Sequence, residues 1–147
     1  MRICFFGHAD FTGSEELEYR LISIIHKYTD TEDCEFLFGG YGRFDDFAFY
    51  CVSKLVSPFA IRKTFVTPYI TESYQKNQLE YRKYKYDLVI YPEIENVPYK
   101  FAISARNKWI VEHSDIVICY VNHRYGGAYS IYSYAKKKKQ TFNLGIL

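Results

Sequence analysis

Three times in this chain, an apolar stretch that predicts a β-strand runs into glycine and then into a stretch that predicts a helix. The junctions are Ile3–Phe6 into Gly7 and His8, Phe36–Phe38 into Gly39–Gly42, and Ile116–Val121 into a loop that ends with Gly126, Gly127 and Ala128. In open α/β sheets such junctions lie along one edge, where glycine admits a ligand close to the backbone and helix N-termini offer N–H groups to anions. The pattern predicts a nucleotide-type pocket along that edge.

Hydrophobic periodicity predicts the other elements. We expect strands over 2–6, 35–38, 61–66, 87–91, 116–121 and 141–144, the fourth of them buried. We expect a helix that opens at the capping-box sequence 12–15, and further helices over 44–55, 99–113 and 127–139. Residues 70–86 fit either a helix beside the pocket or a lid. The alternation of strands and helices predicts a mainly parallel α/β sheet covered on both faces.

Size, charge and cysteine usage narrow the class of protein. The 147 residues are enough for a single domain, 1–147, and the net charge of +2 does not favour nucleic acid as a partner. The four cysteines contain no C-x-x-C pair, so we interpret them as buried reduced thiols of a cytoplasmic protein. Because a strand is predicted from residue 2 onward, we expect no signal peptide. No apolar run reaches the ~20 residues of a membrane span. We expect no metal site and no cofactor.

Aromatic residues make up 20% of the chain, mostly 16 Tyr and 12 Phe. Such a surplus exceeds what one small core readily hides, so we predict a homodimer or higher oligomer. The alternative is ordinary filling of the core.

Arg106 is the most informative side chain of the helix expected over 99–113. Successive helical residues turn by about 100°, so Arg106 lies across the helix from the polar Lys108 and faces inward. An inward arginine requires an anionic partner. Either it faces an open, solvated pocket and clamps a phosphate or carboxylate of a ligand, or it forms an internal ion pair with Asp115 or Glu95. We favour the clamp because the glycine junctions independently predict an anion.

Other candidate residues leave two interpretations open. The stretch Gly39–Asp45 matches neither G-x-G-x-x-G nor the Walker pattern, so it is either a phosphate loop or a tight turn into a helix. Gly126, Gly127 and Ala128 have the same ambiguity. His8 directly follows the first strand, where it either contacts a ligand or caps the next helix.

A set of short motifs carries a family resemblance. The motifs are Phe5–His8, Gly39–Asp45, Tyr91–Glu95, Ala102–Asn107, Ser114-Asp115 and Gly126–Ala128. Their order resembles that of YpsA-like proteins in the SLOG superfamily, which also includes Lonely Guy and DprA-type domains, and the resemblance covers nearly the whole chain. It implies a Rossmann-like three-layer sandwich that binds a nucleotide or nucleotide-derived ligand of the ADP-ribose type. Such domains are proposed as sensors or sequestering proteins in bacterial stress or anti-phage signalling.

The junctions and the resemblance together predict the ligand-binding residues. These are Gly7, His8, Gly39, Gly40, Gly42, Phe44, Asp45, Glu95, Arg106, Asn107, Gly126, Gly127 and Ala128.

Two departures from the family pattern matter, the first for anion binding and the second for catalysis. YpsA-like proteins commonly have Gly-His-Arg after the first strand, whereas this chain has Ala9 in place of the arginine. Lonely Guy enzymes cleave the base from a nucleoside monophosphate with an Arg resembling Arg106 and a Glu in the Gly-Gly helix. The matching stretch, 126–133, contains no carboxylate, so we lean against an enzyme and assign no catalytic residue.

Two alternatives from other functional classes remain open. One is a phosphoribohydrolase that uses Glu93, Glu95 or Asp45 in place of the missing glutamate. The other is an assembly protein whose tyrosine-rich 70–86 segment is an interface and whose pocket is vestigial.

Overall fold

The computed structural model describes residues 1–69 and 80–147. Within them, six strands form one sheet: β1 (Arg2–Gly7), β2 (Cys34–Phe38), β3 (Ile61–Val66), β4 (Leu88–Ile90), β5 (Ile116–Tyr120) and β6 (Gln140–Asn143). Their spatial order is β4-β3-β2-β1-β5-β6, and every neighbouring pair is parallel. The predicted mainly parallel α/β fold is therefore confirmed.

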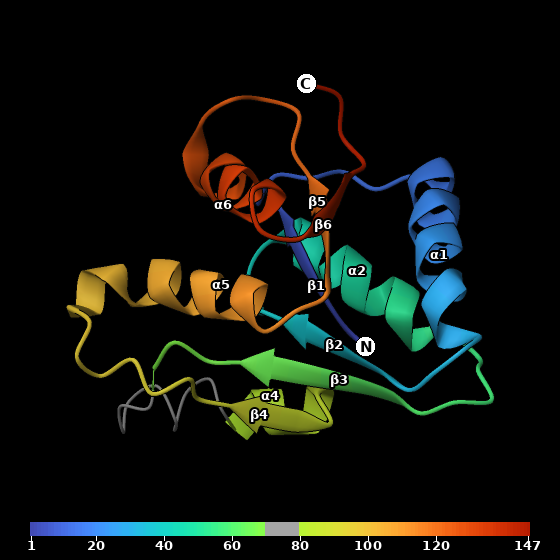
Figure 1. Cartoon of the computed structure of the whole chain (residues 1–147), viewed down its shortest axis with the longest axis horizontal. Coiled ribbons are helices and arrows are strands. Elements are labelled where there is room, and N and C mark those ends of the chain that lie inside the picture. The colour runs from blue at the N-terminus through green and yellow to red at the C-terminus, as the bar shows by residue number, and fades with distance from the viewer. Residues whose placement is uncertain (70–79) are drawn as a thin grey trace.

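Helices cover both faces of this sheet (Figure 1). They are α1 (Glu15–Thr29), α2 (Arg43–Ser53), the short α4 (Glu80–Lys85), the 3₁₀ turn η2 (Tyr99–Phe101), α5 (Ala102–Glu112) and α6 (Gly126–Lys136). On β1, Ile3 and Phe5 belong to the core beneath α1 and α2, whereas Cys4 and Phe6 belong to the core beneath α5 and α6. Because both faces are buried, the strand is apolar throughout, and the predicted three layers are confirmed.

The strand order places a crevice between β1 and β5. The chain lays β2, β3 and β4 to one side of β1 and then returns to place β5 and β6 on the other side. The helix that follows β1 packs with α2, and the helix that follows β5 packs with α5 on the opposite face. In open α/β sheets, ligands bind outside the carboxyl ends of the strands at such a switch point.

Two local predictions need correction, and a third lies largely outside the described residues. The N-cap of α1 is Ser14 rather than Thr12, because the Ser14 hydroxyl accepts the Leu17 N–H at 3.2 Å. The strand at 87–91 is not buried: among the described strands β4 pairs with β3 alone, and Leu88 is 39% exposed. In the ambiguous segment 70–86, residues 70–79 lie outside the described residues, and α4 covers Glu80–Lys85.

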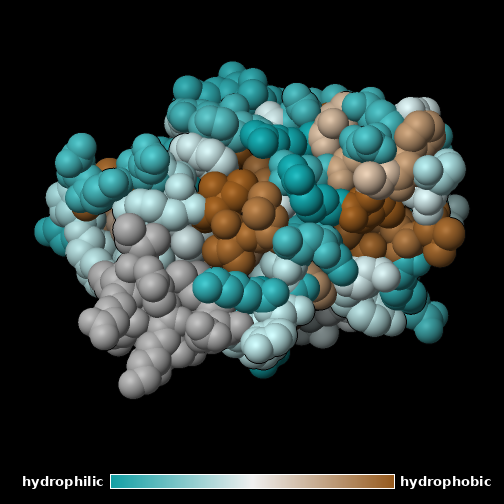
Figure 2. Space-filling model, turned by 90° about the horizontal axis from the view of Figure 1, so that it is seen from below, coloured by the Kyte–Doolittle hydropathy of each residue, from teal (hydrophilic) through white to brown (hydrophobic). Residues whose placement is uncertain are grey.

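The surface carries apolar and aromatic side chains in separate places. Figure 2, seen from the side of β4, shows apolar patches interrupted by hydrophilic side chains. Exposed aromatic rings include those of Tyr41, Tyr99 and Tyr125. The homo-oligomer stays a prediction.

All four cysteines are free and buried. No helix in the described ranges has the length and apolar character needed to cross a membrane.

Candidate functional site

A cavity of about 280 Å³ opens at the carboxyl ends of β1 and β2. It lies at the same edge of the sheet as the switch point. Its walls come from the β1 end, the β2–α2 connection, the inner side of α5 and the first turn of α6. Eight of the predicted residues line it: Gly7, His8, Gly39, Asp45, Arg106, Asn107, Gly127 and Ala128. Gly40, Gly42, Phe44, Glu95 and Gly126 are not among its lining residues. The sequence did not single out Tyr41, Ile103 and Ile131, which also line it.

Phe44 is a core residue rather than a wall of the cavity. Its side chain is fully buried beneath β1, where it packs against Phe11 with ring centroids 5.1 Å apart. A Cβ atom on Gly7 would lie 2.4 Å from the Phe44 ring, closer than real Cβ contacts allow. Gly7 is therefore glycine because α2 packs tightly against the end of β1, and Phe44 belongs to the core rather than to the lining of the cavity.

Only one lining glycine has open space in front of it. A Cβ atom on Gly39 would lie 3.2 Å from the Arg106 guanidinium, so Gly39 makes room for that side chain. Nothing lies within 4 Å of a Cβ atom built on Gly127. The idea that glycine admits a ligand close to the backbone thus fits Gly127, whereas Gly7 and Gly39 serve packing.

Arg106 points inward, as its helical position predicts, but it does not face an open, solvated pocket. The side chain is 3% exposed, and its Nη1 donates to the carbonyl oxygens of Gly39 at 3.0 Å and Val66 at 2.8 Å. Its Nε donates to Asn107 Oδ1 at 2.9 Å. Arg106 therefore joins α5 to the ends of β2 and β3, and its charge lies at the cavity wall.

The two carboxylates expected as internal partners of Arg106 lie elsewhere. Asp115 accepts the backbone N–H of Arg2 at 2.9 Å, at the amino edge of the sheet. Glu95 is exposed in the connection from β4 to η2. Carbonyl oxygens, rather than either of these carboxylates, hold the Arg106 guanidinium in place.

Asp45 is the buried carboxyl group of the cavity. It lies in the first turn of α2, is 6% exposed, and its Oδ2 has no hydrogen-bond partner among the described residues. Burial raises the pKa of Asp45 to about 7, against the lowering effects of the Gly40 backbone N–H and the Arg106 charge. Near neutral pH this group can both give and take a proton.

The N-terminus of α6 completes the wall opposite the sheet. Tyr125 is its N-cap residue, and no side chain bonds to the first-turn N–H groups, unlike the Ser14 cap of α1. Gly127 and Ala128 in that first turn line the cavity. Uncapped N–H groups and the positive end of the helix dipole favour an anion.

His8 connects this cavity with a second one of about 290 Å³, which Tyr120 and Tyr125 also line. Its Nε2 accepts the Asn122 N–H at 3.2 Å, so its ring bonds to the β5–α6 loop rather than capping α1. The ring stacks on His123 with centroids 3.6 Å apart, and His123 stacks against Tyr125. Burial lowers the pKa of His8, and the charge of His123 lowers it further.

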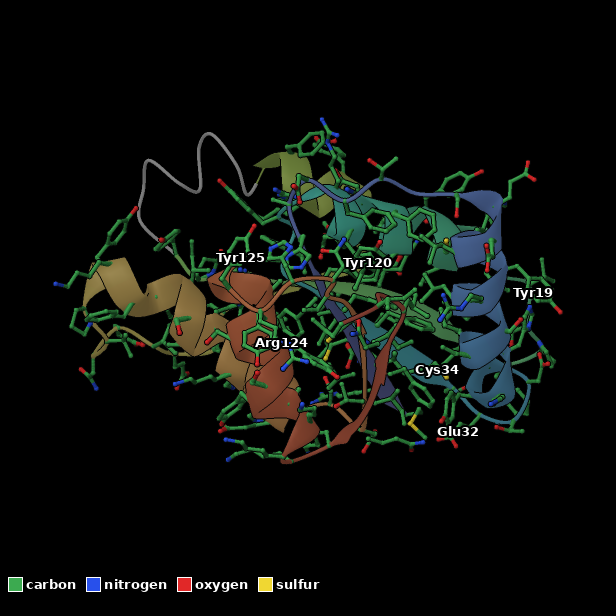
Figure 3. The ribbon with its side chains drawn as sticks, turned by 90° about the horizontal axis from the view of Figure 1, so that it is seen from above. Tyr19, Glu32, Cys34, Tyr120, Arg124 and Tyr125 are labelled. Carbon is green, nitrogen blue, oxygen red and sulfur yellow. The ribbon has the colours of Figure 1, made fainter. Side chains whose placement is uncertain are left out.

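The stacked rings lie at the carboxyl edge of the sheet. Figure 3 shows Tyr120 and Tyr125 there, away from Glu32 and Cys34 at the amino edge. Residue spacing gave no signal for this stack, because its rings come from loops more than a hundred positions apart in the chain.

A further hollow extends the cavity between α5 and α6. This space of about 410 Å³ shares Ile103, Asn107, Gly127 and Ile131 with the first cavity. A ligand bound at the α6 N-terminus thus has room to extend along the two helices. Within the part of the chain that is described, no group of three or more His, Cys, Asp or Glu side chains is arranged to hold a metal ion.

Comparisons with known proteins show the fold but no closer relationship. No family model matches the sequence, and no curated protein matches it either. Among solved structures, the chain is similar to DNA processing protein A (DprA) from Streptococcus pneumoniae, with a TM-score of 0.64 and 15% sequence identity. The match covers 97% of this chain and 49% of that one, so the chain spans about half the length of DprA. The chain therefore has a Rossmann-like, DprA-like fold.

Proposed function

We propose that the chain binds a nucleotide or nucleotide-derived ligand of the ADP-ribose type in the carboxyl-edge cavity, as a YpsA-like sensor or sequestering protein. The observation that carries the proposal is that three features occur together in the wall of one cavity. The uncapped α6 N-terminus offers N–H donors, and Arg106 and the buried Asp45 bring a charge and a carboxyl group to the wall. The DprA-like fold supports a ligand at this edge.

Gly127 offers a test that leaves the fold intact. Because nothing lies within 4 Å of its Cβ position, the side chain of Gly127→Glu begins in open space at the cavity wall. The helix N-terminus tolerates that charge, so stability should hold. The negative charge should repel an anionic ligand, whereas the equally large Gly127→Gln serves as the neutral control.

The experiment measures thermal stabilisation of the wild type and both variants by ADP-ribose and by the ribonucleoside 5′-monophosphates. Small molecules released from the denatured wild-type protein are identified in parallel by mass spectrometry. We expect stabilisation of the wild type, a marked loss in Gly127→Glu and a smaller loss in Gly127→Gln. Equal stabilisation of all three proteins would place the ligand elsewhere, and no stabilisation by any nucleotide would contradict the proposal.

Asp45 also favours a second candidate, hydrolysis of an N-glycosidic bond. Of the three carboxylates considered as substitutes for the missing glutamate, Asp45 lines the cavity, whereas Glu93 and Glu95 do not. A carboxyl group with a pKa of about 7 is suited to activate the water that attacks the ribose C1′ while the base departs. Release of free base from a nucleoside monophosphate at ~1 per second would establish this activity. Asp45→Asn should then abolish it.

A further inference from the structure

The buried Oδ2 of Asp45 requires an explanation beyond folding. A buried carboxylate oxygen without a hydrogen bond is costly, and most such groups in proteins are paired. In the described residues no donor reaches this atom, although the Gly40 backbone N–H bonds to the carboxyl group. Asp45 lines the cavity, although Oδ2 itself is enclosed behind the wall. A group that enters the cavity therefore reaches the carboxyl oxygen once the carboxyl group turns about its Cβ–Cγ bond.

The charged groups near Asp45 are engaged with other partners, and the nearby Tyr86 hydroxyl, which also lacks a partner among the described residues, does not reach Oδ2. Arg106 donates to Gly39, Val66 and Asn107, and Lys85 reaches the neighbouring Asp46 at 3.5 Å. Asp46 itself is an exposed carboxylate outside the cavity. A ligand group that satisfies Oδ2 must therefore bring its own donor hydrogen.

The chemistry of the ligand limits which group that is. A phosphate has only acceptor oxygens once ionised, and an ionised Asp45 repels it. A hydroxyl donates a hydrogen bond to a carboxylate and also accepts one from a carboxylic acid, so it suits Asp45 in either protonation state. In a nucleotide, the hydroxyl groups are those of the ribose, and the phosphate is left for the α6 N-terminus.

We propose that Oδ2 of Asp45 binds a ribose hydroxyl of the ligand, so that the cavity selects ribonucleotides over their deoxy counterparts. This inference rests on the proposed function. It assigns Asp45 a role in specificity that does not require catalysis, and it assigns the two ends of the ligand to different walls of the cavity.

The test compares 5′-monophosphates of adenosine, guanosine, cytidine and uridine with their 2′-deoxy forms, and the 3′-deoxy form of the tightest binder, by calorimetry. The wild type should bind the ribonucleotide ~10- to 100-fold more tightly than at least one deoxy form, the usual value of a hydrogen bond to a charged group. Asp45→Asn, which is nearly isosteric, should bind the ribonucleotide more weakly and lose most of the preference. Asp46→Asn, which changes the exposed carboxylate next to Asp45, should keep the preference for the ribonucleotide.

The outcomes separate this inference from the proposed function. If no nucleotide binds the wild type, both are overturned. If ribose and deoxyribose forms bind the wild type equally, or if Asp45→Asn keeps the full preference, the proposed function stands and the role of Asp45 is overturned.

Discussion

Replacing Asp45 by asparagine should change how the stability of the ligand-free protein depends on pH. The pKa of Asp45 is raised from 3.8 to about 7 in the folded protein. A group with a raised folded-state pKa contributes stability that is fully present below its unfolded pKa and is lost as the pH rises through its folded pKa. The wild type should therefore lose stability between about pH 4 and pH 7 through this group, whereas Asp45→Asn does not titrate.

The size of the effect follows from the shift. Between about pH 5 and the folded pKa of about 7 lie ~2 pH units, each worth ~1.4 kcal/mol. The difference in unfolding free energy between Asp45→Asn and the wild type should therefore grow by about 3 kcal/mol, in favour of the variant, from pH ~5 to pH ~8.5. Other titrating groups are common to both proteins and cancel in this difference.

Urea unfolding of both proteins at the two pH values measures this quantity, and NMR titration of the Asp45 carboxyl carbon measures the pKa directly. Asp46→Asn is the matched control, because that carboxylate is 67% exposed. Its removal takes away one charge that raises the pKa of Asp45, so the loss of stability should persist and only move to lower pH. Parallel stability curves for wild type and Asp45→Asn, or a carboxyl titration near pH 4, would refute the reasoning.

Three further substitutions test other parts of the site. Gly7→Ala should destabilise the protein by about 1–3 kcal/mol because the new Cβ meets the Phe44 ring, whereas Gly127→Ala, which meets open space, should not; equal urea midpoints would contradict this. Arg106→Ala should lower the free energy of unfolding by at least about 3 kcal/mol, since it leaves the carbonyl groups of Gly39 and Val66 without their donor. A loss below ~1 kcal/mol would contradict the role of Arg106 in joining α5 to the strand ends. Because burial lowers the pKa of His8, this residue should reduce the stability of the wild type as the pH falls below about 6.5. The loss should be absent in His8→Gln and present in the control His26→Gln, whose side chain is 43% exposed. Identical acid unfolding of all three proteins would exclude this role of His8.

The sequence predicted the sheet well because its signals are local. Apolar runs that end in glycine marked β1, β2 and β5, and their buried positions on both faces are what a parallel sheet requires. The inward direction of Arg106 followed from helical geometry alone. A strand at the sheet edge was harder to place, since the apolar residues of β4 do not reveal that it has a neighbour on one side only.

The interior of the site was less predictable because it depends on tertiary packing. The sequence indicated that Gly7 and Gly39 were special, but the reasons are the Phe44 ring and the Arg106 guanidinium, which come from other elements. Likewise, nothing in the sequence states that Asp45 is buried and lacks a partner for Oδ2. Such features arise only when α2, α5 and the strand ends meet.

Asp45 connects the stability of the empty protein with the binding of ligand. In the empty cavity Oδ2 lacks a donor among the described residues, and burial raises the pKa of Asp45 to about 7 against the lowering effects of the Gly40 N–H and the Arg106 charge. A ribose hydroxyl that donates to Oδ2 stabilises the ionised form and should lower this pKa. Ribonucleotide binding should therefore release protons near pH 7, and affinity should rise with pH up to that value in the wild type relative to Asp45→Asn, a comparison in which the titration of the phosphate cancels. Calorimetry in two buffers of different ionisation enthalpy counts the protons, and proton uptake would mean that Asp45 instead donates to an acceptor on the ligand.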